Sequence, residues 1–471
     1  MIASAQNEKS SRVTHLQGHP DRRCAALLTS RGAAARRAFG AGAPLEHPIR
    51  TLFLAALCMC VLAPVARADD RVDASTSWYL ERRKGGQGAL SVLHPQLDAS
   101  VDAGDHVTVG IGYAADVVSG ATSSVYSVDA TSSATTFSDT RHSASTSLGF
   151  KGSRSAITFG VGAGAESDYT SISGSVSGNV DLPGKNTNLA LAYTHNFDEV
   201  CDRDNGMATA LERRSLTGAV GGEAHPCKVE KLVRGKDDPG VTIWHEISID
   251  TAQATWTQNV SPTLVLQTSL FGQVLRGFQA NPYRRVRVSG IEAQENLPDV
   301  RGRLALMVQA NKYVERVRGA VHGSIRGYSD TWGVNSGALE MAYSQYAGDA
   351  LLLRVRGRIY QQSEATFFKD AFFYDTEGPA GEFFTGDREL APVRNVLLGG
   401  KLAYIGVNES GGNVWGVFDE VELDLKADLL LLDELPANSL DENPMGIDNQ
   451  FLSSGQLIDA ILLQLSLQTA F

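Results

Sequence analysis

The last eleven residues of the chain alternate between apolar and polar side chains. One parity carries the apolar residues Ile461, Leu463, Leu465, Leu467 and Phe471. The other parity carries Gln464, Ser466 and Gln468. A period of two is typical of a β-strand with one apolar and one polar face. The same alternation recurs within residues 107–113, 157–162, 303–308 and 351–356. The chain is therefore expected to consist largely of such strands.

The C-terminal segment resembles the last strand of bacterial outer-membrane β-barrels, which ends on an aromatic residue. In those proteins the barrel-assembly machinery recognises the aromatic C-terminus, and Phe471 occupies that position here. No apolar run in residues 69–471 approaches the ~20 residues that a membrane-spanning helix needs, so only strands could cross a membrane. The resemblance implies a barrel whose apolar face contacts outer-membrane lipid and whose polar face lines a lumen.

Short and long connections alternate along the chain. The short ones fall at residues 103–105, 152–154, 183–185, 261–262 and 348–349. The long ones fall at residues 119–139, 200–244, 276–299, 364–391 and 428–456. Outer-membrane barrels have short periplasmic turns and longer external loops. With residues 71–82 as the first strand and 457–471 as the last, we predict an all-β transmembrane antiparallel barrel of about 16 strands, within a range of about 14 to 18, with both termini in the periplasm.

Residues 47–68 have the three parts of a secretory signal peptide. A basic flank at residues 47–50 precedes an apolar core at residues 52–62, and Ala66-Arg67-Ala68 precedes Asp69. We expect cleavage after Ala68, export to the bacterial outer membrane, and a mature barrel of residues 69–471. Residues 1–46 would then be an unstructured extension or the result of a misassigned start codon.

Net charge and cysteine content bear on whether the chain binds nucleic acid or metal and on whether it forms a disulfide. Removal of residues 1–68 takes away nine basic and three acidic side chains, which changes the net charge from −11 to −17. A nucleic-acid partner is not expected, because it would require a concentrated basic face. Two cysteines remain, Cys201 and Cys227, and in an oxidising envelope we expect a disulfide between them that closes a surface loop. Nothing nearby completes a zinc site, and neither a metal nor a cofactor is expected.

Charged residues gather on the polar parity of the strands toward the C-terminus. In chain order they are Arg354, Arg356, Arg358, Lys401, Glu420, Glu422 and Asp424. Because neighbouring strands pair side by side, a basic ladder is expected beside an acidic one on the lumen wall. One interpretation is a charged constriction that selects solutes. The other is a set of ion pairs that neutralise each other and fill the lumen.

The segment from Glu364 to Leu390 is rich in aromatic residues. They are Phe367, Phe368, Phe372, Phe373, Tyr374, Phe383 and Phe384. So many exposed aromatic side chains would favour aggregation. We therefore expect them to pack on each other, to enter the lumen or to contact a partner.

A catalytic interpretation is weaker. Tyr193-Thr194-His195 is similar to the Tyr-Thr-His of outer-membrane phospholipases, and His195 has lipid-facing parity. The residues that follow, 196–198, are Asn-Phe-Asp and lack the serine of that family. Without a nucleophile, we expect no enzymatic activity and a hydrogen-bonded His195 at the membrane interface.

Five segments in the same order resemble a bacterial outer-membrane family, domain of unknown function 3570. They are Asp116-Val117-Val118-Ser119-Gly120-Ala121-Thr122, Asn281-Pro282-Tyr283-Arg284, Glu295-Asn296-Leu297-Pro298-Asp299, Tyr328-Ser329-Asp330-Thr331-Trp332-Gly333 and Arg358-Ile359-Tyr360-Gln361-Gln362. The resemblance covers most of residues 71–471 and implies an outer-membrane barrel. It supplies no substrate.

Two functions are consistent with these patterns. The first is a porin-like channel for small polar solutes. The alternative is a closed barrel that acts as a scaffold, presenting surface loops or docking an envelope partner, for example in extracytoplasmic electron transfer. The sequence leaves the solute, the partner and the oligomeric state open.

Overall fold

The computed structural model describes residues 70–81, 90–122, 135–166, 169–202, 243–280, 285–288, 291–368, 383–385, 387–407, 414, 418–435 and 459–471. The signal peptide at residues 47–68, the preceding extension and Cys227 lie outside these residues, as does the side chain of Cys201. The cleavage site and the disulfide therefore stay predictions.

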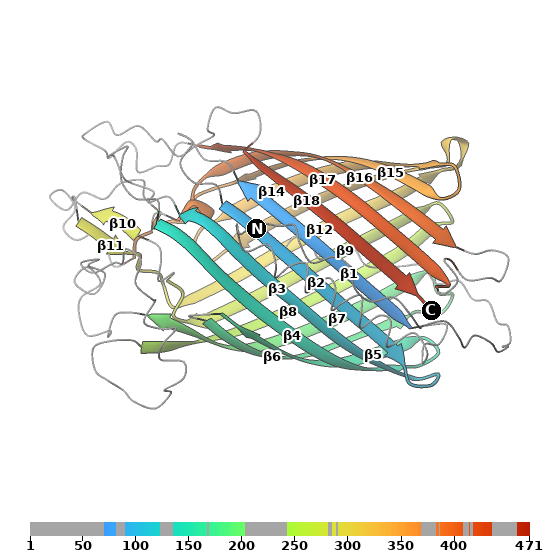
Figure 1. Cartoon of the computed structure of the whole chain (residues 1–471), viewed down its shortest axis with the longest axis horizontal. Coiled ribbons are helices and arrows are strands. Elements are labelled where there is room, and N and C mark those ends of the chain that lie inside the picture. The colour runs from blue at the N-terminus through green and yellow to red at the C-terminus, as the bar shows by residue number, and fades with distance from the viewer. Residues whose placement is uncertain are drawn as a thin grey trace, which may run out of the picture. The chain divides into compact units, whose positions relative to one another are not determined.

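Within the described residues, sixteen antiparallel strands form one closed barrel (Figure 1). They are β1 Arg71–Glu81, β2 Leu90–Asp102, β3 Val107–Thr122, β4 Thr135–Lys151, β5 Ser155–Ala165, β6 Tyr169–Asp181, β7 Thr187–Asp202, β8 Ile243–Ser261, β9 Leu264–Gly277, β12 Val300–Val314, β13 Gly319–Asp330, β14 Asn335–Ala347, β15 Leu351–Gln362, β16 Val393–Val407, β17 Glu420–Glu434 and β18 Ala460–Ala470. The predicted all-β barrel and its strand number are confirmed.

The first and last strands close the barrel. β1 and β18 pair along their whole length, from Arg71 opposite Ala470 to Glu81 opposite Ala460. Just beyond this pairing, the backbone N–H of Phe471 donates to the carbonyl oxygen of Asp70 (3.0 Å). Closure satisfies the backbone groups of both edge strands, which is the condition for crossing a bilayer with strands.

The connections are mostly short at one end of the barrel and mostly long at the other. Several connections depart from the predicted alternation of short and long. β1 begins and β18 ends at the end that has mostly short turns, while most long connections are at the other end (Figure 1). Residues 166–168 and 331–334 are short connections at the long-loop end, and residues 408–419 form a long connection at the short-turn end. The loop predicted at residues 428–456 was wrong at its start, because β17 continues to Glu434.

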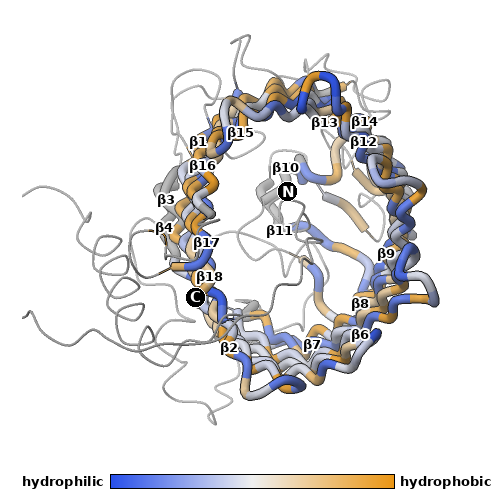
Figure 2. Tube along the Cα trace, turned by 90° about the vertical axis from the view of Figure 1, so that its right-hand side faces the viewer, coloured by the Kyte–Doolittle hydropathy of each residue, from blue (hydrophilic) through white to orange (hydrophobic). Residues whose placement is uncertain are grey.

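The two faces of the wall differ in polarity, and hydropathy alternates along the strands when the barrel is viewed from one end (Figure 2). Outward side chains are large, apolar and exposed, as at Val161 (59% exposed) and Leu191 (67%). Inward positions carry mainly small, polar or charged residues, such as Ser173 and Arg354. An apolar exterior around a polar interior is the polarity required of a barrel embedded in lipid.

Of the residues described, no helix is both long enough and apolar enough to span a bilayer.

A small hairpin of β10 (Arg285–Val288) and β11 (Ile291–Gln294) stands apart from the barrel wall. Figure 1 shows it beyond the strand ends at the long-loop end, and Figure 2 shows it projected within the ring of strands. The connection between β9 and β12 therefore extends over the mouth of the barrel.

Candidate functional site

Lys401 joins the predicted basic and acidic ladders in the lumen wall. Its Nζ lies 2.7 Å from Oδ2 of Asp424 and 3.2 Å from Oε1 of Glu422. The strand register places these residues on the inward face of β16 and β17. Glu420, at the first position of β17, is exposed and lies toward the short-turn end. The second interpretation of the ladder, mutual neutralisation, thus applies to this part of the wall.

Arg356 pairs with an acid that the sequence analysis had assigned to a loop. Its Nε donates to Oδ1 of Asp428 (3.0 Å) and its Nη2 to Oδ2 (2.6 Å). Glu340 on β14 lies 3.8 Å from Nη1 on the other side. Gly399 is the register partner of both Arg356 and Asp428, and a side chain there would collide with the Asp428 carboxylate. The glycine allows the pair to form across β16.

A second row of cations crosses three strands at the next inward position. Arg354 on β15 lies opposite Lys401, which lies opposite Lys426 on β17. Lys426 reaches Oδ2 of Asp428 at 3.7 Å. Lys426 and Asp428 were missed by the sequence analysis, although the inward parity of β17, continued past Asp424, would have found both.

Arg326 is a cationic residue on the inner face of the barrel. It lies on β13 opposite Met307 and Ala338, and its side chain is exposed although its register places it on the lumen face. Within the described part of the chain it forms no ion pair. Arg358, two strands away on β15, has a buried Nε without a hydrogen-bond partner among these residues. Glu340 is the register partner of Arg358 on β14, so Arg326 is the inward cation of this wall whose charge no described carboxylate offsets.

The opposite wall is lined by glycine and serine. β5 lies halfway around the sixteen-strand ring from β15, and its inward Gly160 and Gly162 face Ser175 and Ser173 of β6. A Cβ added at Gly160 would lie only 2.5 Å from Oγ of Ser175, and one at Gly162 only 2.7 Å from Oγ of Ser173. Each serine thus occupies the space that its neighbour's missing side chain leaves. The middle of β5 and β6 is therefore lined by glycine and by the hydroxyl groups of serine.

A buried carboxylate fixes the turn between β13 and β14 at the long-loop end. Asp330 accepts hydrogen bonds from Nε and Nη2 of Arg301 (2.9 and 2.5 Å) and from the hydroxyl of Tyr328 (2.8 Å). It also accepts from the backbone N–H groups of Trp332 (3.0 Å) and Val334 (2.9 Å). The Arg301 guanidinium lies 4.1 Å from the centre of the Trp332 ring, within the range of a cation–π contact.

The aromatic segment packs against this turn. Phe367 contacts Trp332 edge to face, with ring centres 5.3 Å apart, and lies 6.4 Å from Phe383. Phe368 and Phe384 are buried. Of the three alternatives expected from the sequence, packing is observed for Phe367 with Phe383 and for Phe367 against the cluster that contains Phe368. Phe372, Phe373 and Tyr374 lie outside the described residues.

The same segment is bonded to the connection between β9 and β12. The buried carboxylate of Glu295 accepts a hydrogen bond from the hydroxyl of Thr385 (2.6 Å). Asn296 and Phe384 exchange two backbone hydrogen bonds (3.0 and 2.9 Å). Gln362, at the end of β15, donates to the carbonyl oxygens of Glu389 (2.9 Å) and Ala391 (2.7 Å). Three of the segments that carry the family resemblance thus meet in one packed cluster at the barrel mouth.

His195 is on the outer surface of the barrel. Its Nδ1 is 2.8 Å from Oδ1 of Asp250, and its ring contacts that of Phe197. Phe197 stands two positions after His195, and no serine is hydrogen-bonded to the imidazole among the residues described. His195 is hydrogen-bonded, as expected from the sequence, and its location at the membrane interface stays a prediction. The absence of enzymatic activity stays a prediction.

Among the described residues, no three His, Cys, Asp or Glu side chains converge as a metal site would require.

A closed sixteen-stranded barrel with an apolar exterior and a charged, polar interior is an outer-membrane-type β-barrel. The family model described as "Protein of unknown function (DUF3570)" matches residues 50–404. The chain belongs to this family. The match ends within β16, so β17 and β18, with Asp424 and Asp428, lie beyond it.

Solved structures with similar barrels share little sequence with this chain. The "Bacterial polysaccharide outer membrane secretin" is 7% identical, with 86% of this chain and 99% of that chain covered and a TM-score of 0.43. OmpT of Vibrio cholerae is 8% identical (86% and 99% covered, TM-score 0.38), and OccD3 (OpdP) of Pseudomonas aeruginosa is 9% identical (85% and 91% covered, TM-score 0.38). Among curated proteins, none matches this sequence. The fold assignment rests on the closed strand order itself.

Proposed function

We propose that the protein is a channel of the bacterial outer membrane that admits small polar solutes. The observation that carries this proposal is the exposure of inward polar side chains. Ser175 and Ser177 on β6 and Arg326 on β13 face the lumen by register and are exposed to solvent. Exposed polar groups on the inner face require water inside the barrel, and a water-filled interior is what a porin uses for passage.

The unequal charge of the two walls favours anionic solutes. Arg326 forms no ion pair among the described residues and is exposed, while the middle of the facing strands β5 and β6 offers glycine and serine. Rings or ladders of basic side chains select anions in pores, because they replace part of the solute's hydration with favourable electrostatic interaction. The ion-paired Arg356 and Lys401 contribute less to this selection, since nearby carboxylates offset their charge.

The alternative function, a scaffold that presents loops or docks a partner, is supported by the cluster at the mouth. Residues from the β9–β12 connection and from the segment after β15 pack around Trp332 into a hydrophobic core of their own. A well-packed cluster at the mouth of the barrel could form a rigid surface to which a partner binds. The cluster is equally able to narrow a channel entrance, which is the role we assign to it.

Single-channel recording in planar bilayers tests the proposal. Purified full-length mature protein should give steady unitary currents, with a reversal potential in a KCl gradient that indicates anion preference. A protein that inserts into the bilayer, as shown by protease protection of its strands, but passes no current would contradict the channel and support the scaffold. Edman sequencing of the exported protein should start at Asp69 if the signal peptide is cleaved after Ala68.

A further inference from the structure

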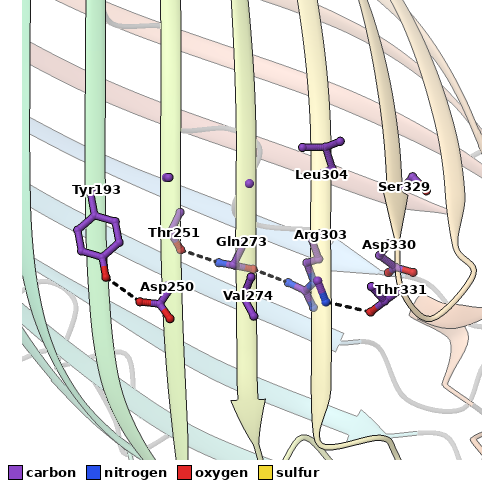
Figure 3. A pocket seen from close by; sticks show the side chains of 13 residues that line it. Tyr193, Asp250, Thr251, Gln273, Val274, Arg303, Leu304, Ser329, Asp330 and Thr331 are labelled. Atoms are coloured by element: carbon purple, nitrogen blue, oxygen red, sulfur yellow. Dashed lines mark hydrogen bonds between the residues drawn. The ribbon is translucent and has the colours of Figure 1, made fainter.

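A hollow of about 520 Å³ lies in the barrel wall near the long-loop end, across β7, β8, β9, β12 and β13 (Figure 3). Most of its lining residues have outward parity, which places the hollow on the membrane-facing side. In strand order these outward residues are Tyr193, Asp250, Ala252, Gly272, Val274, Gly302, Leu304, Ser329 and Thr331. The volume falls within the ~300–1,000 Å³ that is usual for ligand sites.

Small residues create the hollow. Ala252, Gly272 and Leu304 are successive partners in the strand register, and Val274 lies opposite Gly302. A Cβ added at Gly272 would have no neighbouring atom within 4 Å. The neighbouring parts of the outer wall carry large apolar side chains such as Leu270 and Leu306. The missing side chains therefore leave an apolar groove between ridges, directly at the lipid-facing surface.

A cluster of polar side chains stands at one end of this groove. Asp250 accepts hydrogen bonds from the hydroxyl of Tyr193 (2.7 Å), from Nδ1 of His195 (2.8 Å) and from Nη1 of Arg276 (2.9 Å). Figure 3 shows Tyr193 directed toward Asp250 at the edge of the hollow. All four residues have outward parity, where an apolar side chain would be expected in the membrane.

Arg276 retains capacity to bind an anion at this position. It is the next-to-last residue of β9, close to the long-loop rim, and its side chain is 56% exposed. A guanidinium has five N–H donors, and among the described residues only Asp250 pairs with that of Arg276. Lipid phosphates border the apolar band of a bilayer, and arginine binds phosphate through paired hydrogen bonds.

We propose that this groove binds one acyl chain of a phosphorylated membrane lipid whose phosphate is held by Arg276. The apolar floor at Ala252 and Gly272 accommodates the chain, and the polar cluster holds the headgroup at the end of the groove. The site depends on the barrel lying in a bilayer and is independent of whether the lumen conducts. It would hold a lipid more tightly than the surrounding wall, where apolar ridges leave no room for a chain.

Native mass spectrometry of the full-length mature protein, extracted from its membrane in mild detergent, tests this site. We expect a fraction of the protein to retain one phosphorylated lipid. Gly272→Leu should lower the association constant of the phosphorylated lipid for the protein by about tenfold. This corresponds to a loss of ~1.4 kcal/mol in binding free energy. Arg276→Gln should release the phosphorylated lipid while leaving retention of added diacylglycerol unchanged. Gly174→Leu is the matched control, because Gly174 faces outward on β6 and also has no atom within 4 Å of an added Cβ.

Equal retention of phosphorylated lipid by the original protein and by the Gly272→Leu variant would overturn the proposal. The proposal would also be overturned if the protein formed a dimer and Gly272→Leu dissociated it, because a second copy of the chain would then occupy the groove. Retention of inorganic phosphate without lipid would also overturn it. The lower mobility of boiled compared with unboiled protein on gels confirms that each variant has folded, so loss of lipid cannot be attributed to an unfolded barrel.

Discussion

Arg356 and Asp428 are 72 positions apart in the sequence and form a two-bonded ion pair across an intervening strand, through the space above Gly399. The Asp428 side chain is only 2% exposed and that of Arg356 18%. Their contact ties β15 to β17 on the lumen face. The charges of the ladder are thus structural at this level of the wall.

Arg356→Met should destabilise the barrel, because it leaves the buried Asp428 carboxylate with only the more distant Lys426. Removing one partner of a buried ion pair costs about 3–5 kcal/mol. The measurement is the urea midpoint of unfolding in detergent micelles or lipid vesicles.

The exposed pair between Arg394 and Asp433 is the control for this substitution. Their side chains are 55% and 47% exposed, and Arg394→Met should cost no more than ~1 kcal/mol. The double variant Arg356→Met/Asp428→Leu should recover much of the lost stability, since no buried charge is left alone. A single Arg356→Met variant as stable as Arg394→Met would contradict the structural role.

Arg326→Glu should reverse the ion preference of the channel. Two unit charges ~4 Å apart interact by about 4 kcal/mol at an effective dielectric constant of ~20, so even with screening the ratio of anion to cation permeability should fall by about tenfold. Reversal potentials in a KCl gradient measure this ratio. Arg394→Glu, outward on β16, should leave it unchanged. An unaltered reversal potential in Arg326→Glu would show that this residue is not in the ion path.

Gly160→Ala should destabilise the wall opposite the charged ladder. The new Cβ would lie 2.5 Å from Oγ of Ser175, so this hydroxyl must turn to another rotamer, and we expect a cost near the lower end of the ~1–3 kcal/mol of overpacking. Adding Ser175→Gly should restore stability by removing the collision. Gly174→Ala, where the added carbon has no neighbour within 4 Å, serves as the control, and unfolding midpoints compare the variants. Failure of the second substitution to rescue the first would argue against direct contact between the two positions.

Asp330→Ala should loosen the cluster at the mouth. The substitution leaves Arg301 and two backbone N–H groups without their acceptor, at ~1–3 kcal/mol for each buried unsatisfied group. Opening of the adjoining segment should then speed tryptic cleavage at Lys369 or Arg388 by about tenfold. Cleavage on intact cells, followed by mass spectrometry, measures the effect.

The control for the mouth cluster is Asp349→Ala in the turn after β14. Asp349 is 96% exposed and lies at the opposite end of the barrel. Its substitution should leave cleavage of the segment after β15 unchanged. Equal cleavage rates in both variants would show that Asp330 does not hold this segment.

Local alternation in the sequence determined which residues face lipid and which face the lumen. Leu353 and Arg354 have opposite environments because successive side chains in a strand point to opposite faces. The same property, with the turn residues between strands, predicted about sixteen strands. These features depend on neighbours along the chain, so they can be read from it directly.

Only the tertiary structure decided which charges are neutralised and where the outer groove lies. The end of β17 was predicted too early, because Leu429, Leu430, Leu431 and Leu432 do not alternate, and this removed Asp428 from the ladder. Pairing of Arg356 with Asp428, or of Tyr193 with Asp250, depends on the register between strands distant in sequence. Register is set by closure of the whole barrel, and its consequences for individual side chains exist only once all sixteen strands are in place.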